Sequence, residues 1–236
     1  MIGKGKSISH GTAALEYDLA KEIDGQTAAI EIARHELYGC TGAEMVQEMK
    51  PYHADFPNVK NNCLRFEVSP SIEESATFTD ADWAELGNDF MQRMGLANHQ
   101  YIIIRHSGTE SKKEQAHLHI LANRVSLSGE LYRDNWIGKK ATEAANAIAK
   151  ERNFVQSQDI GKVNKAEIKE AMDGVLKKMQ GFDFTKFKEE LGKRGFKVRE
   201  ARASTGKLNG YYVTARSGTE YKASEIGKGY TLAHIE

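Results

Sequence analysis

The sequence predicts an α+β fold, in which a largely antiparallel sheet with packed helices is followed by a small helix-plus-hairpin subdomain. Short apolar runs rich in β-branched residues indicate strands, and two of these runs are joined by a polar turn. Longer stretches with apolar residues every three or four positions indicate amphipathic helices. A chain of 236 residues suits one large domain with an appendage. We expect a first domain over residues 1–155 and a second over residues 164–236.

The most distinctive pair of strands lies near the middle of the chain. Tyr101–Ile104 is strongly apolar and β-branched, which is typical of a buried strand. Ser107–Gln115 is polar and carries no periodicity, so it is expected to turn the chain back. His117–Leu121 then alternates between the two faces, as a strand requires. The two runs are therefore expected to pair as a hairpin.

Three histidines are expected to converge on this hairpin. Alternation places His117 and His119 on one face of the second strand, and pairing brings His106, at the end of the first strand, beside them. Three imidazoles on one sheet face predict a divalent-metal site. By ligand type, imidazoles favour manganese, zinc or nickel over magnesium. The alternative is a half-exposed histidine pair without a ligand role.

The elements before the hairpin follow from periodicity and capping residues. Residues 1–8 can form an edge strand, and Ser9 or Thr12 can cap a helix that extends to Leu19. The other elements expected here are helices over Gln26–Leu37 and Thr41–Met49, a strand over Cys63–Val68, and a helix from its cap Thr79 to Gly95. Glu67 on the expected strand would face the histidines if that strand neighbours the hairpin. Its alternative is a solvated surface position.

The elements after the hairpin suggest a change of organisation. A helix is expected from about Gly138 to Arg152, and Asn153–Val163 is interpreted as a linker. The last third is expected to contain a helix capped by Asn164, a helix from Thr185 to Gly195, and strands over Phe196–Ala201, Tyr211–Ala215 and Glu220–Lys222. These segments make up the expected helix-plus-hairpin subdomain.

The overall charge of the chain does not by itself indicate a nucleic-acid partner. The sequence contains 33 Lys and Arg and 33 Asp and Glu, whereas affinity for DNA depends on neutralising phosphates. The distribution is uneven, because residues 1–160 carry 17 basic against 23 acidic residues and residues 161–236 carry 16 against 10. The basic C-terminal third is compatible with local DNA contact.

The sequence predicts a cytoplasmic protein without membrane insertion. No apolar run approaches the ~20 residues of a membrane span, and the N-terminus lacks the apolar core of a secretory signal. Cys40 and Cys63 form no metal or redox spacing, so a reducing compartment is the simplest setting.

The residues around the histidines resemble a known motif. NHQYIIIRH, followed by HLHILANRV and SLSGELYRD, resembles the metal-binding motif of conjugative relaxases of the P-type mobilisation family, within the His-hydrophobic-His endonuclease class. The similarity extends upstream through TFTDADWAELGNDFMQRMGLANHQY to SHGTAALEYDLAKE, and covers roughly residues 1–152. The sequence departs from the family at Gly108, where the family has an aspartate. The loop before the histidine pair is also longer and more charged.

The resemblance implies a function and assigns roles to individual residues. It implies a metal-dependent relaxase that nicks one DNA strand at a plasmid or transposon transfer origin through a covalent 5′-phosphotyrosine intermediate and can rejoin strands. Tyr17 matches the family's nucleophile, with Tyr38 as the reserve candidate. His106, His117 and His119 match its metal ligands, for which the family implies magnesium or manganese.

The resemblance also implies a DNA partner. Single-stranded or hairpin DNA at an origin of transfer is expected, together with accessory mobilisation proteins and a coupling protein. Lys4, Lys6, Arg105 and Arg124 are candidate contacts to its phosphates, although ordinary salt bridges at the sheet are the alternative role of the two arginines. Two other functions remain open, namely a rolling-circle replication initiator with the same chemistry and a catalytically silent DNA-binding mobilisation accessory protein.

Overall fold

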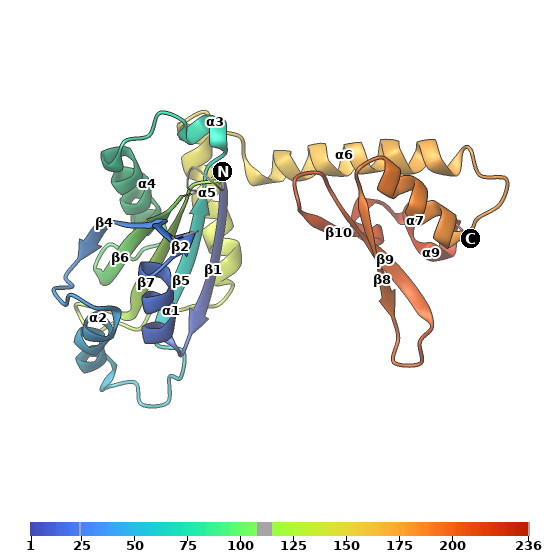
Figure 1. Ribbon diagram of the computed structural model, residues 1–236. Helices are drawn as coiled ribbons and strands as arrows, with labels where there is room; N and C mark the ends of the chain where they lie inside the picture. The colour runs from blue at the N-terminus through green and yellow to red at the C-terminus, as the bar shows by residue number, and fades with distance from the viewer. Residues whose placement is uncertain (24, 108–114, 236) are drawn as a thin grey trace. The chain divides into compact units, whose positions relative to one another are not determined.

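The computed structural model describes residues 1–23, 25–107 and 115–235, and the chain divides into two compact units (Figure 1). The first unit is Met1–Ser157 and the second is Gln158–Glu236. Gly108, where the sequence departs from the relaxase motif, lies outside the described residues. Among the described residues, no helix combines the length and the apolar composition that a membrane span requires.

A five-stranded antiparallel sheet forms the centre of the first unit, which confirms the expected α+β class. In spatial order the strands are β1 (Ile2–Ile8), β5 (Cys63–Ser69), β7 (His117–Ser126), β6 (His99–His106) and β4 (Ala29–His35). The strand at one edge is β1, as expected for residues 1–8. The hairpin is also confirmed, because β6 pairs with β7 and His106 lies directly opposite His117.

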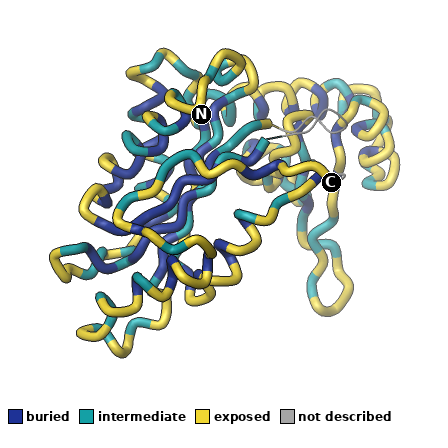
Figure 2. The backbone as a smooth tube through the Cα atoms, turned by 60° about the vertical axis from the view of Figure 1, so that its left-hand side comes forward, coloured by how far each residue is buried: buried dark blue, intermediate teal, exposed yellow. Residues whose placement is uncertain are grey.

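Helices cover both faces of this sheet (Figure 1). On one face, α4 (Asp80–Arg93) and α5 (Ile137–Glu151) pack on a core that includes Phe66 and Ile103. On the other face, α1 (Gly11–Leu19) and α2 (Gly42–Met49) pack on a smaller core that includes Ile104. The central strands are therefore buried on both sides, as the dark blue tube in Figure 2 shows. Shorter elements of this unit are β2 (Glu22–Ile23), β3 (Gln26–Thr27), η1 (Lys50–His53) and α3 (Ile72–Ser75).

Two glycines on β1 allow α5 to pack closely against the edge of the sheet. A Cβ atom at Gly3 would lie 2.4 Å from the Ala141 carbonyl oxygen and 2.6 Å from the Ala145 Cβ. A Cβ atom at Gly5 would lie 2.8 Å from the ring of Phe66. Because side chains alternate along a strand, the residues between these glycines project from the opposite face of the sheet.

The expected helix over Gln26–Leu37 is wrong, because β3 and β4 occupy this segment. Ala and Glu favour a helix locally, but β4 is stabilised by pairing with β6, in which Ile30 lies opposite Arg105. Such long-range pairing overrides weak local preference. Tyr38 therefore follows a strand and does not lie on a helix.

Several expected helix starts also differ from the structure. The N-cap of α1 is His10 rather than Ser9 or Thr12, and the N-cap of α7 (Phe184–Lys193) is Asp183 rather than Thr185. The linker expected over Asn153–Val163 is wrong in its second half, because α6 begins at Ser157 and ends at Leu176. Asn164 lies inside this helix, where its side-chain amide donates a hydrogen bond to the Tyr221 hydroxyl over 3.1 Å.

The second unit packs its helices on a small antiparallel sheet. Its strands, in spatial order, are β10 (Glu220–Lys222), β9 (Leu208–Thr214) and β8 (Lys197–Arg202). Ile168 and Met172 of α6 and Phe187 of α7 are fully buried in its core. The three strands correspond to the three strand segments expected for this subdomain. Short helices complete it, namely α8 (Ala223–Ile226), η2 (Lys228–Tyr230) and α9 (Leu232–Ile235).

His99 at the start of β6 makes the stability of the first unit depend on pH. It is buried, and burial lowers the pKa of its imidazole, whereas the unfolded chain takes up a proton at a pKa of about 6.5. The unfolded state therefore binds more protons, so the free energy of unfolding should fall below about pH 6.5, by at most ~1.4 kcal/mol per pH unit for this group. Chemical denaturation at about pH 7.5 and about pH 5.5 should show a larger loss for the wild type than for His99→Asn. Equal losses would contradict this assignment.

Candidate metal centre

Three histidines meet on the sheet face that α1 covers. His106 lies directly opposite His117 in the β6–β7 ladder, and His119 lies two residues further along β7 on the same face. One ring nitrogen from each histidine lies within 4.8 Å of one ring nitrogen from each of the other two. The structure thus brings together the three residues that the sequence pattern placed on one face.

Backbone carbonyls orient two of the three imidazoles. His106 Nε2 lies 2.7 Å from the carbonyl oxygen of Asp18, and His117 Nδ1 lies 2.9 Å from the carbonyl oxygen of Gln115. Each carbonyl accepts the N–H of its ring, which leaves the other ring nitrogen with a free lone pair. Histidines that bind metals are commonly oriented in this way.

The electrostatics of the cluster also suit a metal site. The Nε2 atoms of His117 and His119 lie only 3.1 Å apart. Burial lowers the pKa of His106, and burial together with the neighbouring imidazoles lowers the pKa of His119 to about 2. These two imidazoles are therefore neutral near pH 7. Neutral, converging nitrogen donors fit a divalent cation.

An ion pair between α1 and β5 lies beside the histidine cluster. Asp18 is 1% exposed, and its carboxylate accepts hydrogen bonds from Nε of Arg65, over 3.0 Å, and from Nη2. Arg65 Nη2 also lies 3.3 Å from His119 Nδ1, and Asp18 Oδ1 lies 3.8 Å from the same nitrogen. Asp18 therefore holds His106 directly through its backbone carbonyl, and its carboxylate reaches His119 through Arg65.

The sequence analysed alone does not assign a role to Asp18 or Arg65. A signal was present, because Asp18 falls at helical spacing from Ala14 and Leu15, which form the buried side of α1. A carboxylate on the apolar side of a helix requires a buried partner. In the segment Cys63–Phe66, Arg65 is the only charged residue, so it is the only residue of that segment that could neutralise the Asp18 carboxylate.

The two candidate nucleophiles occupy different environments. Tyr17 precedes Asp18 on α1, so it is one residue from the carbonyl that holds His106, and its side chain is 68% exposed. Tyr38 follows β4, and its hydroxyl donates a hydrogen bond to Glu36 Oε2 over 3.0 Å. This bond to Glu36 raises the pKa of Tyr38, which opposes formation of a phenolate. Of the two tyrosines, Tyr17 lies on the helix that is attached to the histidine cluster.

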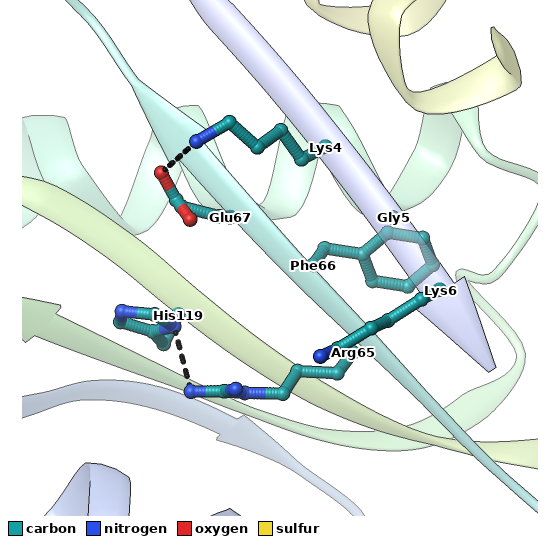
Figure 3. Close-up of a pocket in the computed structure, with 7 residues that line it drawn as sticks. All are labelled: Lys4, Gly5, Lys6, Arg65, Phe66, Glu67 and His119. Carbon is teal, nitrogen blue, oxygen red and sulfur yellow. Dashed lines mark hydrogen bonds and ion pairs between the residues drawn. The ribbon is translucent and has the colours of Figure 1, made fainter. Parts of the chain in front are cut away.

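Two lysines of β1 lie on the same sheet face as the histidines. Lys4 forms a 2.8 Å ion pair with Glu67, which lies opposite His119 on the neighbouring strand. Lys6 lies opposite Arg65 and is exposed, without an ion-pair partner among the described residues. These side chains border a hollow of about 210 Å³ that extends to His119 (Figure 3). Because Lys4 and Arg65 are paired with carboxylates, the positive charge that this hollow presents beside the histidine cluster comes from Lys6.

The structure does not bring Arg105 and Arg124 to this site. Alternation places both on the opposite face of the sheet, Arg105 next to His106 in sequence and Arg124 between Asn123 and Val125. Arg105 forms an ion pair with Asp80 at the start of α4. Arg124 forms an ion pair with Asp134 at 2.6 Å. Both arginines thus have the salt-bridge role that was the alternative to DNA contact.

Comparison with known proteins identifies relatives of the first unit. The family model "Relaxase: MobA/VirD2-like, nuclease domain" matches residues 17–154. Among solved structures, the chain is similar to the conjugative relaxase TrwC in complex with oriT DNA. The metal-bound TrwC structure has 12% identity and a TM-score of 0.37, and the metal-free structure has 10% and 0.38. Each match covers 88% of this chain and 74% of TrwC. None of the curated proteins matches the chain.

Replacing any histidine of the cluster should weaken binding of a divalent ion. We expect His106→Ala, His117→Ala and His119→Ala each to lower the affinity for Mn²⁺ at least ~10-fold, because changing even the groups that orient a ligand costs about 10–100-fold. Isothermal titration calorimetry measures the affinity, and circular dichroism checks the fold. His53→Ala is the matched control, because His53 Nε2 contacts Asn123 Oδ1 and lies outside the cluster. Unchanged affinity in all three cluster variants would exclude the site.

Proposed function

The chain belongs to the MobA/VirD2-like relaxase nuclease family, and on this basis we propose that it nicks and rejoins one DNA strand with Tyr17 as nucleophile and a divalent ion as cofactor. The observation that carries the proposal is the attachment of α1 to the histidine cluster. Asp18 accepts hydrogen bonds from His106 and Arg65, so the helix that carries the neighbouring residue, Tyr17, is attached to the cluster. Its exposed hydroxyl is accessible to a DNA strand.

The reaction is a transfer of a phosphoryl group between two hydroxyls. The Tyr17 oxygen forms a bond to the scissile phosphorus, and the bond from phosphorus to the 3′ oxygen breaks. The phenol loses its proton, and the 3′ oxygen gains one. The protein retains the 5′ end as a phosphotyrosine, and attack of a 3′ hydroxyl on this ester rejoins the strand. No net bond energy is lost, because one phosphodiester replaces another.

Histidine nitrogens would hold the cofactor of this reaction. A divalent ion bound by His106, His117 and His119 would withdraw negative charge from the non-bridging phosphate oxygens. We propose magnesium or manganese as that ion, with zinc or nickel as alternatives that imidazole ligands favour. The chain itself contributes neutral, oriented imidazoles and a fixed position for α1. The buried pair of Asp18 and Arg65 supplies this fixed position.

The positive hollow beside the cluster is proposed to hold the DNA backbone. Lys6 is exposed and Arg65 lies directly opposite it, so both can approach a phosphate next to the scissile one. The second unit carries the excess of basic residues and is proposed as a further contact. We propose single-stranded or hairpin DNA at an origin of transfer as the substrate, in the cytoplasm, with accessory mobilisation proteins and a coupling protein as partners.

Tyr17→Phe should abolish the covalent intermediate while leaving the fold intact. The substitution removes one oxygen from an exposed ring, so it changes little packing. The wild type incubated with Mn²⁺ and a labelled single strand that contains its nick site should give an adduct that survives denaturation and migrates with the protein in a gel. Tyr38→Phe is the matched control and should still form it.

Each outcome separates the candidate functions. An adduct that persists in Tyr17→Phe and disappears in Tyr38→Phe would move the nucleophile to Tyr38. If no variant and no wild type forms an adduct on any strand that it binds, the protein is a silent DNA-binding mobilisation factor. An adduct that forms at a replication origin but not at a transfer origin would indicate a rolling-circle initiator.

Lys6→Ala should weaken DNA binding through the loss of one phosphate contact. For single strands, the slope of log affinity against log salt is about −0.7 for each neutralised phosphate, so the variant's slope should be shallower by about that amount. Fluorescence anisotropy with a labelled single strand at several salt concentrations measures both values. Lys150→Ala, at an exposed position in the last turn of α5, is the control and should match the wild type. An unchanged slope in Lys6→Ala would show that DNA does not contact the hollow through Lys6.

A further inference from the structure

Trp136 is the most exposed large hydrophobic side chain among the described residues, at 81%. It is the N-cap residue of α5 and adopts the left-handed conformation, with φ 58° and ψ 29°. A bulky side chain rarely adopts this conformation, which is strained and persists only where the surroundings enforce it. Both the exposure and the strain are unfavourable for an isolated folded chain. A role in binding would account for them.

The surrounding structure enforces this conformation. Asp134, two residues earlier, accepts hydrogen bonds from Ser7 of β1 and from Arg124 of β7. Ile137, the next residue, is buried, and its N–H donates to the Asp134 carbonyl over 3.1 Å. Trp136 is thus held between an anchored residue and a buried one, and its indole is directed to solvent. Arg124, a candidate phosphate contact in the sequence, anchors this segment through Asp134.

The surface around the indole is positively charged. Trp136 borders a hollow of about 340 Å³ together with Lys139, Lys140 and Glu143. Lys139 lies 3.7 Å from Glu143, which offsets its charge in part. Lys140 lies over the ring of Tyr132, and Arg133 is exposed. An aromatic ring flanked by cations is the combination that binds unpaired bases and their phosphates.

The Trp136 segment adjoins the proposed DNA path at β1. Ser7, which binds Asp134, is the residue after Lys6, and the two project from opposite faces of this edge strand. Asp134, which binds this Ser7, lies two residues before Trp136, and β1 is an edge strand of the sheet. A strand of DNA that passes Lys6 would therefore cross one edge strand to reach the face that carries the Trp136 segment.

We propose that Trp136 stacks on an unpaired base of the DNA strand after that strand has crossed the β1 edge, with Lys139, Lys140 and Arg133 near its phosphates. The proposal rests on the proposed function, since it adds a second contact to the same substrate. It assigns to Trp136 a role in affinity for single strands, outside the chemical step. Stacking does not depend on base identity, so the contact is independent of sequence.

Affinities for a DNA strand with bases and for a strand without bases test the stacking contact. The probes are a labelled oligothymidylate and an oligonucleotide of equal length in which every nucleotide is abasic, both measured by anisotropy without metal. Trp136→Ala should lower affinity for oligothymidylate about 5- to 150-fold, the range expected for one stacked base, and should not alter affinity for the abasic strand. Trp136→Phe should retain most of the affinity. Equal affinity of Trp136→Ala and wild type for oligothymidylate would overturn the proposal.

Indole fluorescence gives an independent measurement. The chain has two tryptophans, and Trp83 is 2% exposed, so quenching by oligothymidylate should disappear in Trp136→Phe. Quenching that persists would contradict the proposal. Unchanged Mn²⁺ affinity and unfolding temperature in Trp136→Ala exclude loss of the fold. A wild-type tyrosine adduct with no effect of Trp136→Ala on binding would refute this inference alone, whereas a Trp136-dependent affinity without any adduct would refute the nuclease and leave the stacking contact.

Discussion

The buried ion pair between Asp18 and Arg65 is the interaction on which the arrangement of the candidate site depends. It joins α1 to β5 under the histidine cluster, and the Asp18 carbonyl holds His106 from the same helix position. A buried ion pair is weak evidence for stability, because the cost of removing two charges from water can equal their attraction. Apolar residues could attach the helix equally well and would keep the backbone carbonyl that holds His106. They would lose the contact of Arg65 with His119, so we attribute the pair to positioning.

Alternation along the strands decides which charged residues share the site. Lys4 and Lys6 lie on the histidine face, whereas Arg105 and Arg124 lie on the other face and pair with carboxylates. Gly3 and Gly5 of β1 allow α5 to pack closely on one face of the sheet, whereas Lys4 and Lys6 project from the other face. One edge strand thereby connects the histidine cluster with the segment that carries Trp136.

The sequence predicts those parts of the structure that depend on local pattern. The hairpin and its histidines follow from alternation over a few residues, and α4 follows from the Thr79 cap, which the structure retains. β4 is missed because its stabilising partners lie about seventy residues away on β6, and helix-favouring residues dominate locally. Local pattern indicates that Asp18 needs a buried partner, but it does not place Arg65 beside Asp18, because the two are 47 residues apart in the sequence. The carbonyl that orients His106 has no side-chain signature, so local pattern cannot identify it.

The most direct test is anomalous diffraction from crystals of the wild-type protein grown with Mn²⁺. The account predicts one strong peak bonded to a ring nitrogen of His106, His117 and His119, at metal–nitrogen distances of about 2.1 Å. The Asp18 carbonyl should still accept from the opposite ring nitrogen of His106. A peak at other residues, or no peak at saturating Mn²⁺, would contradict the claim that this face of the sheet is a metal centre served by α1.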